Sequence, residues 1–474
     1  MKKTIAILLV AVLAVSSVFA GFSGKATVGL GYNWETKNYG FSNGTGFDVD
    51  VDLTTAEADK VAEGDIYAGI KATMSVKVAN QGGTKGSLVW NSKDKAEANY
   101  GLGLFLKVAE AYVAGENWKV SITGTQGATS YAKSFETVKG EVKDVFGNVI
   151  DTEDVAYDLT GDFALNKAPG VTVEVAGFKG SVGFNGSNVK DNEFFNYNAF
   201  LETPEFSFDG LTLQAAVGAS RNVDPSVTDA TKIHDFALNT SAKVGYATDA
   251  LSLAVAADYD AVKPSKNNDT VYSLFDASAK VVFAPVTVDA YYGLDGKYAK
   301  ELEEADSKYK TLAHKLSAQV ATDLAAFDLP VKVTVWGKDI LNTMDFGAKA
   351  EVTIDAIKLG VNGGYEIDPI PSNRYDGFNV GKYYLGADVE YTNDLFTAKA
   401  GVGFNSYVGK VNGNKVKDLA QLTLKASVES DAIIPGATLK LAYGAADGDQ
   451  NLLKGQGIVA QNLGKVEATC TIKF

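Results

Sequence analysis

Three aspartates at alternate positions, Asp48, Asp50 and Asp52, are the first residues in the chain whose type and spacing could bind a cation. A helix–loop–helix calcium loop needs glycine at its sixth position, and this sequence has Leu53 there. Side chains two residues apart on a strand share one face. A row of acids on the wet face of a strand therefore explains the spacing better, and we predict no metal site.

Residues suited to catalysis are scarce. The chain has only two histidines, His234 and His314, and no nucleophile can be matched convincingly with an orienting base. His314 shares its alternation with Leu312 and Leu316, which favours a place at an interface. Gly-x-Gly pairs begin at positions 29, 101 and 401, but none opens a helix after a strand, so dinucleotide binding is rejected. We predict that the protein is not an enzyme and needs no cofactor.

The N-terminus has the features of a secretory signal peptide. Lys2 and Lys3 precede an apolar stretch that is too short to span a bilayer, and small or aliphatic residues follow at Val18 and Ala20. The sequence therefore predicts export, with cleavage between Ala20 and Gly21. It divides the chain into a signal peptide, residues 1–20, and a single mature domain, residues 21–474.

The composition points to an acidic, β-rich protein. The chain has 58 acidic and 44 basic residues and a formal net charge of -14, which argues against nucleic acid as a partner. Its one cysteine cannot form an internal disulfide. Many aromatic residues and glycines, with only 9 prolines, favour strands over helices or disorder.

Apolar and polar residues alternate through most of the chain, as in FDVDVDL and in the final VEATCTIKF, and the alternation breaks at KVAEAYVAGE and at Pro204. One face of each such strand is apolar, and the other carries the charges. Two environments fit: a core with water outside it, or lipid outside a wet lumen. Short turns near 247–250, 284–286, 355–356 and 392–395 alternate with long polar stretches, among them 294–310 and 406–417. Aromatic residues gather at the strand ends. We therefore predict an all-β fold, a transmembrane antiparallel up-and-down β-barrel of about 20 strands (roughly 18 to 22), with short periplasmic turns and long extracellular loops.

The last strand carries a resemblance to a known superfamily. It has apolar residues at every second position and ends on an aromatic ring, as in the C-terminal assembly signal of Gram-negative outer-membrane β-barrel proteins. The matching residues are Val466, Ala468, Cys470, Ile472 and Phe474. The resemblance implies location in the cell outer membrane and recognition by the barrel assembly machinery. The chain also resembles spirochaete major outer-sheath porin-like proteins.

The inner wall predicted from the alternation carries both charge signs, which implies water inside the barrel. No separate plug is expected at either end, and the stretch 125–170 is long enough to fold inward and narrow the lumen. Asp258, Asp276 and Asp289 also fall on the inner face. The residues chosen as pore-lining are Asp48, Asp50, Asp52, Lys71, Lys77, Lys280, Lys349, Glu351, Lys399, Lys425 and Lys440.

These features predict a porin that gives small hydrophilic solutes or ions passive diffusion through a water-filled lumen. The expected partners are outer-membrane lipid, the barrel assembly machinery and small solutes, without nucleic acid, and a homo-oligomer is left open. Two alternatives remain: a surface adhesin or structural outer-membrane barrel, and a secreted soluble β-sandwich or surface-layer protein.

Overall fold

We analysed a computed structural model of the chain. The residues it describes are 22–34, 37, 39–41, 45–54, 66–80, 100–123, 129–143, 149–159, 170–187, 194–223, 233–264, 271–305, 310–369, 378–411, 413–415, 419–444, 450–453 and 461–473. The predicted signal peptide, Ala20, Gly21 and Phe474 lie outside this part of the chain. Within it, no helix is both long enough and apolar enough to cross a membrane.

Strands form nearly all of the described structure. The N-terminal half contains β1 (Phe22–Asn33), β2 (Tyr39–Phe41), β3 (Gly46–Thr54), β4 (Tyr67–Asn80), β5 (Tyr100–Gly115), β6 (Trp118–Thr123), β7 (Thr137–Lys143), β8 (Val149–Ala156), β9 (Gly170–Val175), β10 (Phe178–Ser187), β11 (Phe194–Glu202), β12 (Phe206–Phe208), β13 (Leu211–Asn222) and β14 (His234–Ala247). The C-terminal half contains β15 (Ser252–Lys263), β16 (Tyr272–Phe283), β17 (Val286–Asp295), α2 (Gly296–Glu304), η3 (Lys310–Ala313), β18 (His314–Asp323), η4 (Leu324–Phe327), β19 (Val331–Lys338), β20 (Asp345–Ile354), β21 (Ile357–Glu366), β22 (Phe378–Thr392), β23 (Thr397–Val411), β24 (Asn414–Lys415), β25 (Ala420–Ile434), β26 (Ala437–Gly444) and β27 (Lys465–Lys473).

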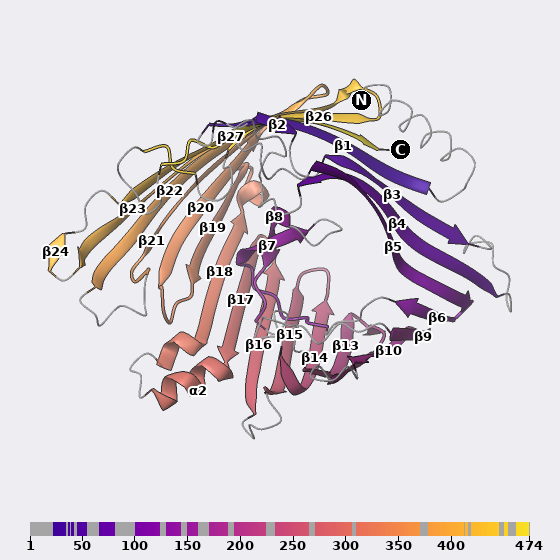
Figure 1. The fold of residues 1–474 in the computed structure, drawn as a ribbon. Coiled ribbons are helices and arrows are strands. Elements are labelled where there is room, and N and C mark those ends of the chain that lie inside the picture. The colour runs from indigo at the N-terminus through magenta and orange to yellow at the C-terminus, as the bar shows by residue number, and fades with distance from the viewer. Residues whose placement is uncertain are drawn as a thin grey trace.

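The strands close into one antiparallel barrel (Figure 1). Closure is made by β1, which pairs with β27 from Lys25 opposite Lys473 to Asn33 opposite Lys465. The described sheet has 25 strands, and three of these are short pieces: β2, β12 and β24 continue the wall positions of β3, β11 and β25. The described barrel wall is therefore 22 strands wide, at the upper end of the predicted range.

The two faces of the wall differ in the sense predicted for a membrane barrel. Large apolar side chains remain exposed on the outside, such as Val335 at 54%, Leu385 at 60% and Leu441 at 54%. Lysine–carboxylate pairs lie on the opposite face of the same strands. A soluble protein would hide the apolar face and expose the charges. The fold is an outer-membrane-type β-barrel, so the soluble β-sandwich alternative is wrong.

The connections alternate in length as expected, with two differences from the sequence prediction. The predicted short turns all join neighbouring strands, for example Ala356 between β20 and β21. The long stretch predicted near 406–417 is partly strand, because β23 continues to Val411. The stretch near 294–310 contains helix α2, which Asp295 caps by accepting a hydrogen bond from the Tyr298 backbone N–H.

The break in alternation at KVAEAYVAGE is a β-bulge. Lys71 of β4 lies opposite Glu110 of β5, but the next residue, Ala72, lies opposite Val108. Ala109 is therefore an extra residue in β5. One inserted residue reverses the alternation on one side of the bulge while the faces of the sheet stay the same.

Candidate functional site

A stretch of the chain between β6 and β9, here called the inward segment, lies in the barrel interior. Its described residues are 129–143 and 149–159, and they include the hairpin strands β7 and β8. Figure 1 shows this hairpin inside the barrel wall and not above its rim. The base of the hairpin is closed by Ser134 and Tyr157, whose backbone groups bond at 2.9 Å, and by a second bond of 2.9 Å from Tyr157 N–H to the Glu136 carbonyl. These bonds hold the two chains of the segment side by side at the base of the hairpin.

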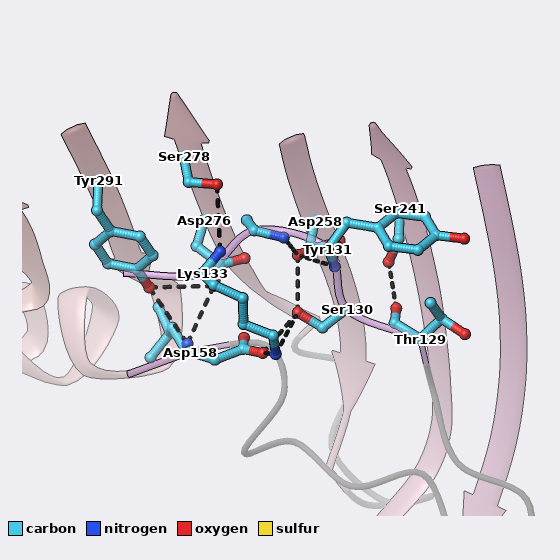
Figure 2. Close-up of polar contacts among 12 residues, drawn as sticks. Thr129, Ser130, Tyr131, Lys133, Asp158, Ser241, Asp258, Asp276, Ser278 and Tyr291 are labelled. Carbon is cyan, nitrogen blue, oxygen red and sulfur yellow. Dashed lines mark hydrogen bonds and ion pairs between the residues drawn. The ribbon is translucent and has the colours of Figure 1, made fainter. Parts of the chain in front are cut away.

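Asp258 on β15 is the first anchor of the inward segment (Figure 2). Its carboxylate accepts hydrogen bonds from the backbone N–H of Tyr131 at 3.0 and 3.1 Å and of Ala132 at 2.6 Å. The Ser130 hydroxyl donates a further bond of 2.9 Å. Both Asp258 and Ala132 are buried, at 1% and 0% exposure. Because the acceptor is charged and shielded from water, this contact fixes the backbone of the segment firmly against the wall.

Asp276 on β16 anchors the other end of the segment. It accepts hydrogen bonds of 3.1 Å from the Leu159 N–H and from the Tyr291 hydroxyl. Between the anchors, the Lys133 backbone N–H donates to the Ser278 hydroxyl at 3.2 Å, and the Ser241 hydroxyl donates to the Thr129 carbonyl. The side chains that receive the segment come from neighbouring strands, β14 to β17.

Asp158 brings a third carboxylate to the anchors. Oxygen atoms of Asp158, Asp258 and Asp276 all lie within 4.8 Å of one another, a spacing that could hold a metal ion. The positive partner present is the Lys133 ammonium group, which pairs with Asp158, and the Ser130 hydroxyl bridges Asp158 and Asp258. Hydrogen-bond donors from the inward segment itself thus compensate the buried acids.

Two further contacts extend the docked surface. Glu136 accepts a hydrogen bond from the Ser317 hydroxyl and forms an ion pair of 3.3 Å with Lys315 of β18. At the opposite end, the Tyr131 hydroxyl donates to Glu202 of β11 at 2.8 Å. Burial, followed by this hydrogen bond and the nearby carboxylates, raises the pKa of Tyr131. The phenol therefore remains a neutral donor.

The docked segment leaves cavities along the inner wall, and charged side chains line each of them. One has a volume of about 490 Å³ and lies between Tyr131 and Lys133 of the segment and Lys243, Lys280 and Asp289 of the wall. A second, of about 700 Å³, is bounded by Phe135 of the segment and by residues of β18 to β23. The inward segment narrows the lumen beside these two spaces.

The structure locates most of the predicted pore-lining residues on the polar face. Asp48 and Asp50 accept hydrogen bonds from Ser75 and Thr73, at 2.6 and 2.7 Å, and Asp52 lies opposite Lys71. The Lys77 side chain lies outside the described part. The remaining predicted lysines and acids form ion pairs in four cases: Lys349–Glu351 at 3.0 Å within β20, and the cross-strand pairs Lys280–Asp289 at 3.8 Å, Lys399–Glu390 at 2.9 Å and Lys440–Glu429 at 3.7 Å. Lys425 lies opposite Gly401.

The other predicted residues separate into two groups. Val466, Ala468, Cys470 and Ile472 lie in β27, the closing strand. His314 bonds through Nδ1 to the Tyr292 hydroxyl at 2.8 Å, and His234 is buried against the Ser220 hydroxyl at 2.6 Å. The alternation places Asp258 and Asp276 on the inner face. It carries no signal that residues about 120 positions earlier in the chain dock on them.

Comparisons with known proteins give the following result. No protein-family model matches the chain, and no curated protein matches it. Among solved structures, similar chains include a mutant of the ferric enterobactin receptor PfeA of Pseudomonas aeruginosa, with 10% identity, a TM-score of 0.44, and coverage of 96% of this chain and 81% of that one. Acinetobacter baumannii OccAB1 has 11% identity, a TM-score of 0.38 and coverage of 96% and 95%. Pseudomonas aeruginosa OpdK has 7% identity, a TM-score of 0.38 and coverage of 96% and 98%.

Proposed function

We propose that the mature chain, residues 21–474, is a single-domain channel of the outer membrane through which small hydrophilic solutes or ions diffuse passively. Residues 1–20 serve as its signal peptide in this proposal. The observation that carries it is the polar inner wall of a closed 22-strand barrel, beside which the inward segment leaves cavities of hundreds of cubic ångströms. A barrel of this width holds water unless its lumen is filled.

The chemistry of the wall supports passage of solutes in water. Its lysines and acids are paired along and across the strands, so a solute meets many hydrogen-bonding groups but a small net field. The net charge of the whole chain is negative, and an acidic mouth would attract cations weakly. We therefore propose a wide channel with mild cation preference. Lining residues include Asp48, Asp50, Asp52, Lys71, Lys77, Lys280, Lys349, Glu351, Lys399, Lys425 and Lys440.

The C-terminal strand fits assembly in an outer membrane. In β27, Ala468 and Cys470 lie between partners in β26 on one side and β1 on the other. In this proposal the barrel assembly machinery reads the strand that ends at Phe474, and membrane lipid covers the outer face. A surface adhesin remains the second candidate, because the sequence has long polar stretches between its strands.

Single-channel recording tests the proposal. The refolded mature protein is added to a planar bilayer in KCl, first symmetrically and then across a salt gradient. Stable conductance steps with a reversal potential of the cation-selective sign are expected. A barrel that migrates faster in detergent gels before boiling than after, yet gives no steps, would refute the channel and favour the adhesin.

A further inference from the structure

Two aromatic rings lie on the inner wall in a single cross-strand row. Trp336 of β19 is opposite Gly347 of β20, which is opposite Gly364 of β21, which is opposite Tyr384 of β22. The indole Nε1–H donates to the Tyr384 hydroxyl at 3.2 Å, so the two side chains meet above the glycines between them. The row is therefore an aromatic pair spread over four adjacent strands.

The two glycines allow the rings to lie against the wall. A Cβ atom on Gly347 would come within 2.5 Å of the Trp336 ring, and one on Gly364 within 2.3 Å of the Tyr384 hydroxyl. Neither distance is possible without displacement, so any larger residue would lift the rings away from the sheet. The Trp336 ring and the hydroxyl end of the Tyr384 ring therefore lie directly over glycines of the wall. Both side chains line the cavity of about 700 Å³.

Polar contacts hold this aromatic pair in place. The Tyr384 hydroxyl donates to Asp345 at 2.7 Å, and thereby links the indole to a carboxylate of the adjacent row. In that row Lys382 donates to Glu366 at 2.6 Å. Trp336, Tyr384 and Asp345 thus form a chain of two hydrogen bonds. A surface whose rotamers are already fixed loses little entropy when a ligand binds.

The charges around the cavity balance. Lys338, Lys349 and Lys382 line it together with Asp345, Glu366 and Asp388, so the ionised side chains sum to zero. A neutral ligand meets no net charge here, whereas an anion would be repelled by the three carboxylates and a cation by the three ammonium groups. Amide groups of Asn362 and Asn405 add further donors and acceptors.

We propose that this cavity is a binding subsite for neutral saccharides, formed by the ring faces of Trp336 and Tyr384. The inference rests on the proposed channel function and names a solute class for it. Sugar rings present flat C–H faces, which pack on aromatic rings, and hydroxyl groups around their edges, which the lysines, acids and amides can bind. Phe135 of the inward segment borders the same cavity from the other side.

Two features compete with this assignment. Lys338 Nζ lies 5.0 Å from the centroid of the indole, on a flexible side chain whose cation–π attraction is weak where water reaches it. Displacement of this ammonium group would free the ring face and leave a donor for a sugar hydroxyl. Aromatic rings also cover glycines in sheets for stability alone. The two roles differ in a measurable way, because only a binding surface responds to sugar.

Current block by maltotriose is the test. Sugar is added to channels of the wild type and of Trp336→Leu, Trp336→Phe and Tyr112→Leu. Tyr112 is the matched control, because its ring lies against Gly69 on another part of the inner wall. We expect the half-blocking concentration to rise about tenfold in W336L, because an aromatic pair contributes roughly that factor. W336F, which keeps a ring, and Y112L should stay within about threefold of the wild type on the same basis.

A second measurement separates this site from the channel itself. The chain has four tryptophans, so the triple variant W34F/W90F/W118F reports on Trp336 alone. Its fluorescence is expected to change with maltotriose in detergent, whether or not the protein conducts. Conductance steps without block or fluorescence change would overturn the saccharide site and leave the channel standing. A fluorescence response without conductance steps would support the saccharide site and refute the channel. Stronger block by tetraethylammonium or citrate than by maltotriose would overturn the neutral class.

Discussion

Replacement of Asp258 by asparagine is expected to release the inward segment from the barrel wall. Asp258→Asn keeps the size of the side chain and one acceptor oxygen, but turns the other oxygen into an N–H donor that faces other donors. The carboxylate accepts bonds from Ser130, Tyr131 and Ala132, in a place where it is 1% exposed. The barrel itself should fold, because its backbone ladder does not use this side chain.

The size of the effect follows from those contacts. A hydrogen bond to a charged group contributes about 1.5–3 kcal/mol, and the three bonds share one acceptor group and are not additive. We expect the docked state to lose about 2–4 kcal/mol, which lowers the ratio of docked to undocked protein by about 30- to 1,000-fold. The substitution also removes one of three neighbouring negative charges, and the relief of their repulsion stabilises the docked state. Lys133 already compensates that repulsion in part, so the lost bonds should dominate.

Limited trypsin digestion measures the release. Lys133 lies within the docked segment, so its cleavage should follow the undocked population. D258N should be cut faster than the wild type and should show larger fluctuations of channel current. Asp289→Asn is the matched control, since Asp289 is on the same wall but bonds to Gln319 and Lys280 of neighbouring strands. Wild-type cleavage rates in a correctly folded D258N barrel would refute docking by this carboxylate.

Two further predictions concern the barrel wall. Val335→Lys places a charge on the outer face, and near the bilayer midplane it should lower the free energy of unfolding by about 2–4 kcal/mol. Thr334→Lys, one residue away on the inner face, is the control and should lower it far less. Urea unfolding of the two variants in a bilayer measures the difference. Deletion of Ala109 removes the extra residue of the β5 bulge and restores strict alternation, so heat-modifiable migration should persist. An alanine inserted after Ala256 should abolish it, because the insertion would turn Asp258 toward lipid.

Much of the barrel could be predicted from the sequence, because alternation is a local signal. Lys349 and Glu351, two residues apart, had to share a face, and their ion pair of 3.0 Å along β20 confirms the strand period. The two places where alternation fails have physical causes. Ala109 is a bulge residue, and Pro204, which cannot donate a ladder hydrogen bond, lies in the gap between β11 and β12.

The candidate site could not be predicted in the same way, because it depends on register and on a long-range contact. Trp336 and Tyr384 are 48 residues apart, and only the pairings of three successive strand pairs place them in one row. A shift of one residue in any of these would separate them. Asp258 and Tyr131 are 127 residues apart, and no strand pairing joins their elements, so the strand pattern gives no signal of this contact.

These two kinds of contact imply different consequences for how the channel works. The aromatic row is part of the ladder, so its geometry is as stable as the barrel. The inward segment is held by side chains, above all by Asp258 and Asp276, and can undock while every strand pairing persists. Solute recognition should therefore change little when the segment moves, whereas the width of the lumen should change greatly. In D258N we accordingly expect a larger conductance, with the half-blocking concentration of maltotriose altered only by the loss of Phe135 from the cavity.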